Sequence, residues 1–171
     1  MNKTVEIIKS RVSCRAYSDK RVSKAKLEQI LEAGKYAPSA MNRQICNILV
    51  IKSKSLLEKI RAALLEKTQR ECLYGAKHLC LVYGPRDDRF TNQDASCILE
   101  NMFLAATALK IDSCWINQLD DLLTDPKYLK LRKKLGLNDD SKVVGSVILG
   151  YRKEGTELQV KPRKEDFIRY V

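Results

Sequence analysis

Hydrophobic residues along the chain follow two patterns, and each pattern predicts one kind of secondary structure. Continuous apolar runs predict strands at 48–51, 78–83 and 143–150, and we expect the first of them to be buried. Apolar residues that return every three or four positions predict helices at 5–10, 24–36, 55–66 and 92–109. Residues 114–116 fit a strand or a tight loop. Because strands and helices do not alternate strictly, the pattern does not predict a doubly wound fold.

Short polar residues and a glycine predict the helix boundaries. Ser23 is expected to cap the second helix, and Gly34 near its end is interpreted as a stop signal. Thr124, with Pro126 close behind it, is expected to open a later helix that runs through Leu135.

The helix over 92–109 has the most apolar surface of all. Its cap is expected near Thr91 or Asn92. A broad face of this helix consists of Ala95, Ile98, Leu99, Met102, Phe103, Ala106 and Leu109, and Ala105 and Ala108 extend it. A helix that is apolar on most sides is either central in the core or packed against another subunit.

Length and charge narrow the class of protein. The 171 residues, 44% of them hydrophobic, predict one globular domain over 1–171. The net charge of +11 raises nucleic acid, anionic membrane or phosphorylated ligands as partners. Acidic residues are interleaved with Lys and Arg in most helical segments, which favours solvated helix faces and local anion sites. We therefore expect neither a nucleic-acid partner nor a membrane partner.

The cysteines point to free thiols. The six cysteines contain no C-x-x-C pair, and His78, the single histidine, has only Cys80 close by, so no metal site is expected. Buried thiols in a reducing cytosol are the expected state. The sequence has neither the apolar core of a signal peptide near its start nor a run of transmembrane length, so we expect a cytoplasmic protein.

Three polar segments carry candidate chemistry. In an extended segment Arg11, Ser13 and Arg15 would share one face and offer two guanidinium groups and a hydroxyl, although for these residues alone a basic surface turn is the favoured interpretation. The loop Ala-Pro-Ser-Ala-Met-Asn-Arg-Gln at 37–44 is rich in hydrogen-bonding groups, which either satisfy the backbone of a turn or face a ligand. The third segment is Lys-Pro-Arg at 161–163, which places two positive charges on alternating positions.

In this order and at these distances, the three segments resemble the nitroreductase family of flavin-dependent oxidoreductases. The helix containing Asp94-Ala95-Ser96 and Asn101-Met102-Phe103, the run at 114–116 and the strand that ends in Gly150-Tyr151 extend the resemblance over nearly the whole chain. The family implies an α+β fold with a central mixed or antiparallel sheet flanked by helices. It also implies an intertwined homodimer with one FMN in each of two clefts at the subunit interface.

The resemblance implies a role for each matching residue. Arg11, Lys161 and Arg163 are similar to a clamp for the FMN phosphate, and Ser13 and Arg15 to contacts with the pyrimidine edge and the ribityl chain. Further cofactor-binding positions implied by the resemblance are Val12, the loop residues Pro38, Ser39, Ala40 and Asn42 from the other subunit, and Trp115, Ile116 and Asn117 near the flavin N5.

The implied reaction needs no catalytic side chain, because the flavin carries the redox chemistry. NADH or NADPH would give a hydride to N5, and a small electron-poor acceptor such as a nitroaromatic or a quinone would then take it. Arg15 is the candidate for stabilising the reduced flavin.

The chain departs from the family pattern at Ile45-Cys46, where Pro-Trp is usual, and at 110–112, where a glycine is expected. Val12 stands where a basic residue or histidine is common, and the segment at 74–77 lacks the usual acidic residue and proline. These departures keep an alternative open, a flavin-binding sensor or store with little turnover.

Overall fold

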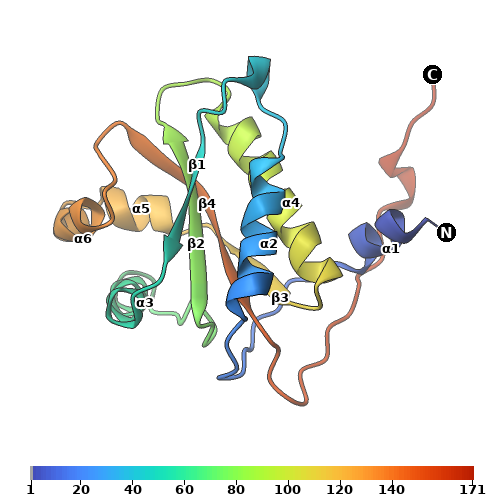
Figure 1. Cartoon of the computed structure of the whole chain (residues 1–171), viewed down its shortest axis with the longest axis horizontal. Coiled ribbons are helices and arrows are strands. Elements are labelled where there is room, and N and C mark those ends of the chain that lie inside the picture. Colours follow the sequence, from blue (N-terminus) through green and yellow to red (C-terminus); the bar gives the residue numbers. More distant parts are fainter. Residues whose placement is uncertain (1) are drawn as a thin grey trace.

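The computed structural model describes residues 2–171 and contains a four-stranded sheet with helices on both faces (Figure 1). The strands are β1 Asn47–Ile51, β2 His78–Pro85, β3 Asp112–Ile116 and β4 Ser141–Gly150. Their order across the sheet is β1-β2-β4-β3, and each neighbouring pair is antiparallel. The predicted α+β class is confirmed, and the short run at 114–116 belongs to a strand.

Two groups of helices lie on opposite sides of the sheet (Figure 1). The helices α2 Lys24–Lys35 and α4 Thr91–Ala108 cover one face, and α1 Lys3–Ser10 packs beside α4. The helices α3 Lys54–Thr68, α5 Leu119–Thr124 and α6 Leu129–Lys134 lie on the other side. Short 3₁₀ turns are found at Ala40–Asn42, Pro126–Tyr128 and Glu165–Phe167.

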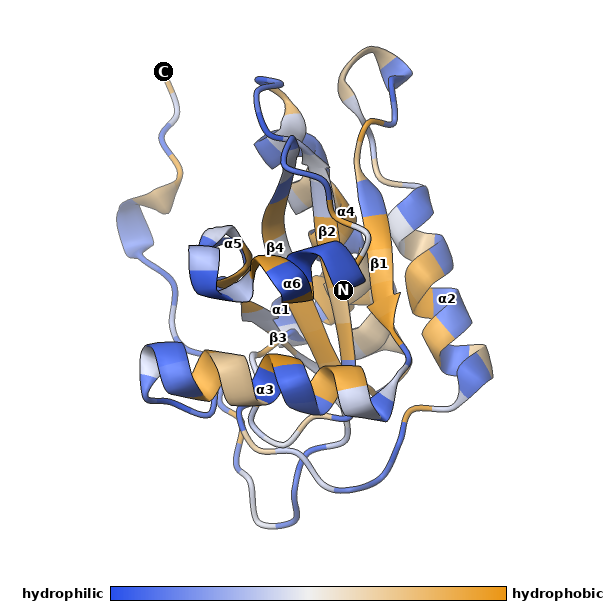
Figure 2. Ribbon diagram, turned by 90° about the vertical axis from the view of Figure 1, so that its left-hand side faces the viewer, coloured by the Kyte–Doolittle hydropathy of each residue, from blue (hydrophilic) through white to orange (hydrophobic). Residues whose placement is uncertain are grey.

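Strand β2 shows why the sheet is apolar on both faces. Its side chains alternate, so Leu79 and Leu81 belong to the core beneath α3 and α5, while Cys80 and Val82 belong to the core beneath α2 and α4. All four side chains are fully buried. Because both faces are covered, the strand appears in the sequence as a continuous apolar run, and the hydropathy colouring shows the same in the central strands (Figure 2).

The prediction that the first strand is buried is wrong in part. Only Ile51 of β1 is buried, and the side chains of 48–50 are half-buried. The reason is that β1 lies at the edge of the sheet and, among residues 2–171, pairs with β2 alone. An apolar edge strand of this kind leaves backbone groups and side chains available for another surface.

Helix α2 begins as predicted, but Gly34 has a different role from the one expected. The Ser23 hydroxyl accepts a hydrogen bond from the Lys26 amide and caps the helix. Gly34 lies inside the helix, which continues to Lys35. A Cβ atom at position 34 would lie 2.9 Å from Cδ1 of Ile48 and 3.0 Å from Cγ of Met102. The glycine therefore allows close packing of α2 and is not a stop signal.

Helix α4 packs against both α2 and the sheet. Most of its broad apolar surface is therefore covered within a single chain, although Ile98 and Ala105 stay half-buried and Ala108 is exposed. Phe90 occupies the cap position, and the prediction of a Thr91 or Asn92 cap is wrong. Thr91 is the first residue of the helix, and its hydroxyl donates a hydrogen bond of 2.7 Å to the Pro85 carbonyl. That bond ties the start of α4 to the end of β2.

The helix predicted to open at Thr124 is two separate elements. Thr124 ends α5, a helix that we did not predict, and the Asp125 carboxylate caps the following turn by accepting from the Lys127 amide. Pro126 begins that turn because it needs no hydrogen-bond acceptor for its nitrogen. Helix α6 follows and ends before Gly136, which has a φ of +72°.

All six cysteines are free, and four of them are buried. No group of three or more His, Cys, Asp or Glu side chains within residues 2–171 is arranged to hold a metal ion. Within the same residues, no helix combines the length and the apolar character needed to cross a membrane.

Candidate functional site

The segment 11–15 is extended and lies beside β3. Ser13 forms an isolated parallel bridge with Ser113, and the Cys14 amide donates to the Ser113 carbonyl at 2.9 Å. The Cys14 side chain is fully buried. Because side chains alternate in extended backbone, Arg11, Ser13 and Arg15 are directed to the opposite side from Cys14.

The Cys114 thiol of β3 lies near all three of these side chains, and each of them affects its pKa. Burial raises the pKa of this thiol, whereas Arg15, a hydrogen bond with the Ser13 side chain, and Arg11 each lower it. One buried atom of β3 is therefore close to both guanidinium groups and to the hydroxyl.

A cleft of about 250 Å³ joins this segment to the C-terminal part of the chain. We call it the basic cleft. It is lined by Arg11, Val12, Ser13, Arg15, Gln159, Val160, Lys161 and Arg163. The structure thus brings together six of the residues that the sequence indicated, from both ends of the chain.

The charges of the basic cleft are not neutralised by the protein. No acidic side chain lines the cleft, and Arg11, Arg15, Lys161 and Arg163 form no ion pair with any acidic group in residues 2–171. Two or more guanidinium groups and a hydroxyl on one wall provide the charged, directional donors that a phosphate needs. The arrangement suits a multiply charged anion.

The predicted residues of β3 lie beside the basic cleft and not in its lining. Ile116 is buried, while Trp115 is exposed to 36%. The Trp115 indole N–H donates to Oδ1 of Asn117 at 3.3 Å. The Trp115 ring stacks on Phe103, and the Arg11 guanidinium lies over that same Phe103 ring. The β3 residues are thus connected to the cleft through one aromatic side chain.

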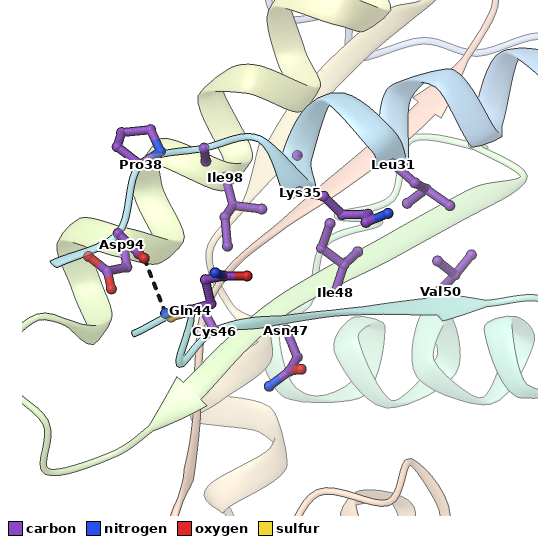
Figure 3. Close-up of a pocket in the computed structure, with 13 residues that line it drawn as sticks. Leu31, Lys35, Pro38, Gln44, Cys46, Asn47, Ile48, Val50, Asp94 and Ile98 are labelled. Carbon is purple, nitrogen blue, oxygen red and sulfur yellow. Dashed lines mark hydrogen bonds between the residues drawn. The ribbon is translucent and has the colours of Figure 1, made fainter. Parts of the chain in front are cut away.

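The loop 38–44 is held by hydrogen bonds from three directions. The Ala40 amide donates to Oδ1 of Asp94 at 3.0 Å. The Gln44 amide donates to the Ser39 hydroxyl at 3.1 Å (Figure 3). Arg43 makes a two-pronged ion pair with Asp88 at 2.8 and 3.0 Å. Arg43 also holds the pKa of the Asp88 carboxyl below its usual range by hydrogen bonding to it.

Backbone strain is concentrated in this loop. Met41, Asn42 and Gln44 have φ values of 54°, 54° and 51°, a region that residues other than glycine rarely adopt. Each such residue costs about 1–2 kcal/mol, and the surrounding contacts must compensate for that cost. Met41 is nevertheless 74% exposed. An exposed loop fixed in a strained shape is typical of a binding surface.

Within one chain, the loop is separate from the basic cleft. The loop is bonded to Asp94 in the first turn of α4, whereas Arg11 contacts Phe103, about 14 Å further along the axis of the same helix. In Figure 1 the turn at Ala40–Asn42 and the segment after Gly150 lie at different sides of the molecule. The predicted residues Pro38, Ser39, Ala40 and Asn42 are therefore not brought to the predicted phosphate clamp.

The loop borders a different cavity, which is largely apolar. This pocket of about 430 Å³ lies between α2, β1 and the start of α4, and we call it the edge pocket (Figure 3). Leu31, Ile48, Val50 and Ile98 provide apolar walls, and Cys46 stands where the family pattern has a tryptophan. Burial raises the pKa of the Cys46 thiol to about 11, so the thiol is uncharged at neutral pH.

Sequence reasoning missed three residues of the candidate site. Gln159 and Val160 line the basic cleft, and their position directly before Lys161 was the only signal available. Phe103 was interpreted as an ordinary core position, because apolar spacing on a helix does not reveal that a ring faces a cation.

Comparison with known proteins gives a consistent result. The model of the family described as "Nitroreductase family" matches residues 8–72 and 66–151. A protein of Archaeoglobus fulgidus with the name "Putative NADH dehydrogenase/NAD(P)H nitroreductase" is 31% identical over 159 residues, which is 90% of this chain and 88% of the relative.

Solved structures share the fold over the whole chain. A nitroreductase from Bacteroides fragilis with bound FMN has a TM-score of 0.90 and 36% identity, and the match covers 100% of both chains. A nitroreductase from Desulfitobacterium hafniense, also with bound FMN, has a TM-score of 0.87 and 27% identity, with coverage of 100% and 99%.

Proposed function

Because the chain belongs to the nitroreductase family and has its fold, we propose that it is an FMN-dependent oxidoreductase that uses NADH or NADPH. A hydride would pass from the reduced nicotinamide through the flavin N5 to an electron-poor acceptor such as a nitroaromatic or a quinone. FMN supplies the redox chemistry when bound. The task of the chain is to bind the cofactor, orient it and exclude water.

The observation that carries the proposal is the set of unneutralised cations in the basic cleft. Arg11, Lys161 and Arg163 are the residues proposed to hold the FMN phosphate, with Ser13 and Arg15 directed toward the ribityl chain and the pyrimidine edge. A volume of about 250 Å³ accommodates the phosphate end of FMN, but it is smaller than the usual cavity for a ligand of this size. The site therefore needs a further surface.

A second copy of the chain is proposed to supply that surface in a homodimer. The loop residues Pro38, Ser39, Ala40 and Asn42 are exposed or half-buried, rigid and distant from the basic cleft of their own chain, which suits a contact with the partner's cofactor. Two other features support a dimer. The tail carries exposed Phe167, Ile168 and Tyr170, and the edge pocket beside β1 has apolar walls.

Anaerobic titration of the purified, FMN-loaded protein tests the proposal. Addition of NADH or NADPH is expected to bleach the flavin absorption, and a quinone or a nitroaromatic is expected to restore it. Purified protein that shows no flavin spectrum even after FMN is added would refute the proposal. A monomeric mass by light scattering would refute the homodimer.

The departures from the family pattern at Cys46 and Lys110 support the alternative function, a flavin-binding protein with little turnover, and the titration distinguishes it from an enzyme. If FMN binds but neither nicotinamide bleaches it at a useful rate, the protein is better described as a flavin-binding sensor or store. The six free thiols, four of them buried, support a place in a reducing compartment, and we propose that the protein is cytoplasmic.

A further inference from the structure

The ring of Phe103 lies between two groups of the candidate site. Phe103 is in α4 and is 4% exposed. Its ring centroid is 6.1 Å from that of Trp115, with 28° between the ring planes. The guanidinium carbon of Arg11 is 6.0 Å from the Phe103 centroid and lies over the ring. One buried side chain therefore contacts both the basic cleft and the end of β3.

Trp115 is held in place from its other side as well. A Cβ atom at Gly145 of β4 would overlap Cζ2 of the indole, so the glycine lets the ring lie directly against the sheet. The indole N–H is bonded to Asn117. The ring is thus fixed by Phe103, Gly145 and Asn117 while part of it stays exposed. This indole gives Phe103 a rigid neighbour.

Arg11 has no comparable restraint apart from the Phe103 ring. No carboxylate in the described part of the chain pairs with Arg11. The face of an aromatic ring carries partial negative charge and attracts a guanidinium group, and burial of the ring strengthens the attraction. The contact restricts the orientations of Arg11 without neutralising its charge, so the charge stays available to an anion.

We propose that Phe103 is a positioning residue of the cofactor site. Its ring orients the Arg11 guanidinium toward the anionic ligand of the basic cleft and does not touch that ligand itself. The inference rests on the proposed function, in which the anion is the FMN phosphate. It adds Phe103 to the site. It also predicts that FMN affinity depends on the negative potential of the Phe103 ring face.

A double-mutant cycle on FMN affinity tests the proposal. Flavin fluorescence gives the Kd for the parent, Phe103→Leu, Arg11→Ala and the double variant. Phe103→Leu is expected to weaken FMN binding about three- to tenfold, in line with the loss of a desolvated cation–π contact. The same substitution is expected to cause almost no further loss in the Arg11→Ala background.

Equal losses from Phe103→Leu in both backgrounds would mean a merely structural role and would overturn the proposal. If the parent protein does not bind FMN, both the proposed function and this inference are refuted. A parent that binds FMN without coupling between positions 103 and 11 would end the inference alone.

Ring fluorination provides a second test that does not depend on how Phe103→Leu folds. Replacing Phe103 with 4-fluoro- and then 3,4,5-trifluorophenylalanine keeps the shape of the ring and reduces the negative potential of its face. The Kd for FMN is expected to rise stepwise with fluorine content. A constant Kd across the series would overturn the proposal.

A matched control is available on the far side of the sheet. Tyr128 lies beneath the Lys127 ammonium at 5.7 Å, in the turn before α6. Tyr128→Leu also removes an aromatic ring from a cation, and it should leave FMN affinity unchanged. Trp115 is the single tryptophan of the chain, so its emission reports whether the stack is intact in each variant.

Discussion

The basic cleft and the loop 38–44 differ in how firmly the protein holds them. The cleft carries four long cationic side chains that pair with no carboxylate in residues 2–171, and one of its walls is an exposed C-terminal segment. The loop has its backbone fixed in strained conformations by Asp94 and by hydrogen bonds within the loop. The cleft provides charge that adapts to a ligand, and the loop provides a fixed shape. In the proposed homodimer, the cleft of one subunit and the loop of the other would meet at one cofactor.

Removing the charge should have the largest effect. The double variant Arg11→Ala, Arg163→Ala is expected to weaken FMN binding by about a hundredfold or more, because a hydrogen bond to a charged group contributes about 1.5–3 kcal/mol. The Kd from flavin fluorescence measures the effect.

The fold should survive this change, because neither side chain is buried. Thermal unfolding of the double variant should stay close to that of the parent. Lys130→Ala with Lys134→Ala removes two exposed cations on α6 and should leave the Kd unchanged. Equal losses in both double variants would show that net charge, not the basic cleft, determines binding.

Releasing the loop should have the next largest effect. Asp94→Ala leaves the Ala40 amide without its acceptor, and we expect the free energy of unfolding to fall by about 1–3 kcal/mol in urea denaturation. Hydrogen exchange at Ala40 should accelerate. Asp94→Asn retains an acceptor oxygen and should restore most of the loss. If Asp94→Ala leaves exchange in the loop unchanged, the loop is not held through α4.

A smaller effect of opposite sign is expected at the end of α4 that is nearer the cleft. Lys110 has a φ of 57° and follows the last turn of the helix, where its amide donates to Thr107 and the Ile111 amide donates to Ala106. This pattern favours glycine at position 110. Lys110→Gly should raise the free energy of unfolding by about 1 kcal/mol. A lower value would show that the lysine side chain contributes more than the strain costs.

The smallest effect is expected outside both regions and depends on pH. Nε2 of His78 accepts a hydrogen bond from the Val22 amide, just before α2. Burial, together with the charge of Arg21, lowers the pKa of His78 below 6.5. As the pH falls below about 6.5, the unfolded chain takes up a proton that the folded chain does not bind, so stability falls.

The loss should stay below about 1.4 kcal/mol per pH unit, since one group is involved. Urea denaturation at pH 7 and pH 5.5 measures it, and His78→Gln should flatten this part of the profile. An unchanged slope in the variant would exclude His78 as the cause.

The sequence predicted most elements because the sheet is buried on both faces and each core helix has one apolar side. It did not predict α5, although Leu119, Leu122 and Leu123 have helical spacing and are fully buried. A helix of six residues offers too little pattern to separate it from the next segment. The role of Gly34 could not be predicted, because it depends on which side chains of β1 and α4 approach α2.

The candidate site was predicted through motifs, and the meeting of its two ends was predicted only through the family resemblance. Six of the eight residues that line the basic cleft were named from both ends of the chain, and the structure places them together. The sequence gives no direct sign that Phe103 faces Arg11, because that contact depends on how α4 packs against residues far away in the chain. Alternation within 11–15 was enough to place Cys14 and the arginines on opposite sides.

The basic cleft also sets an order of events during biosynthesis. Its two walls come from segments about 150 residues apart, so the cleft cannot form until residues 161–163 have been translated. The buried residues of both cores lie at or before Leu149, ahead of the second wall in the sequence. The core residues are therefore translated before Lys161 and Arg163, which complete the cleft. Capture of a phosphate would then be a later step of biosynthesis than formation of the core.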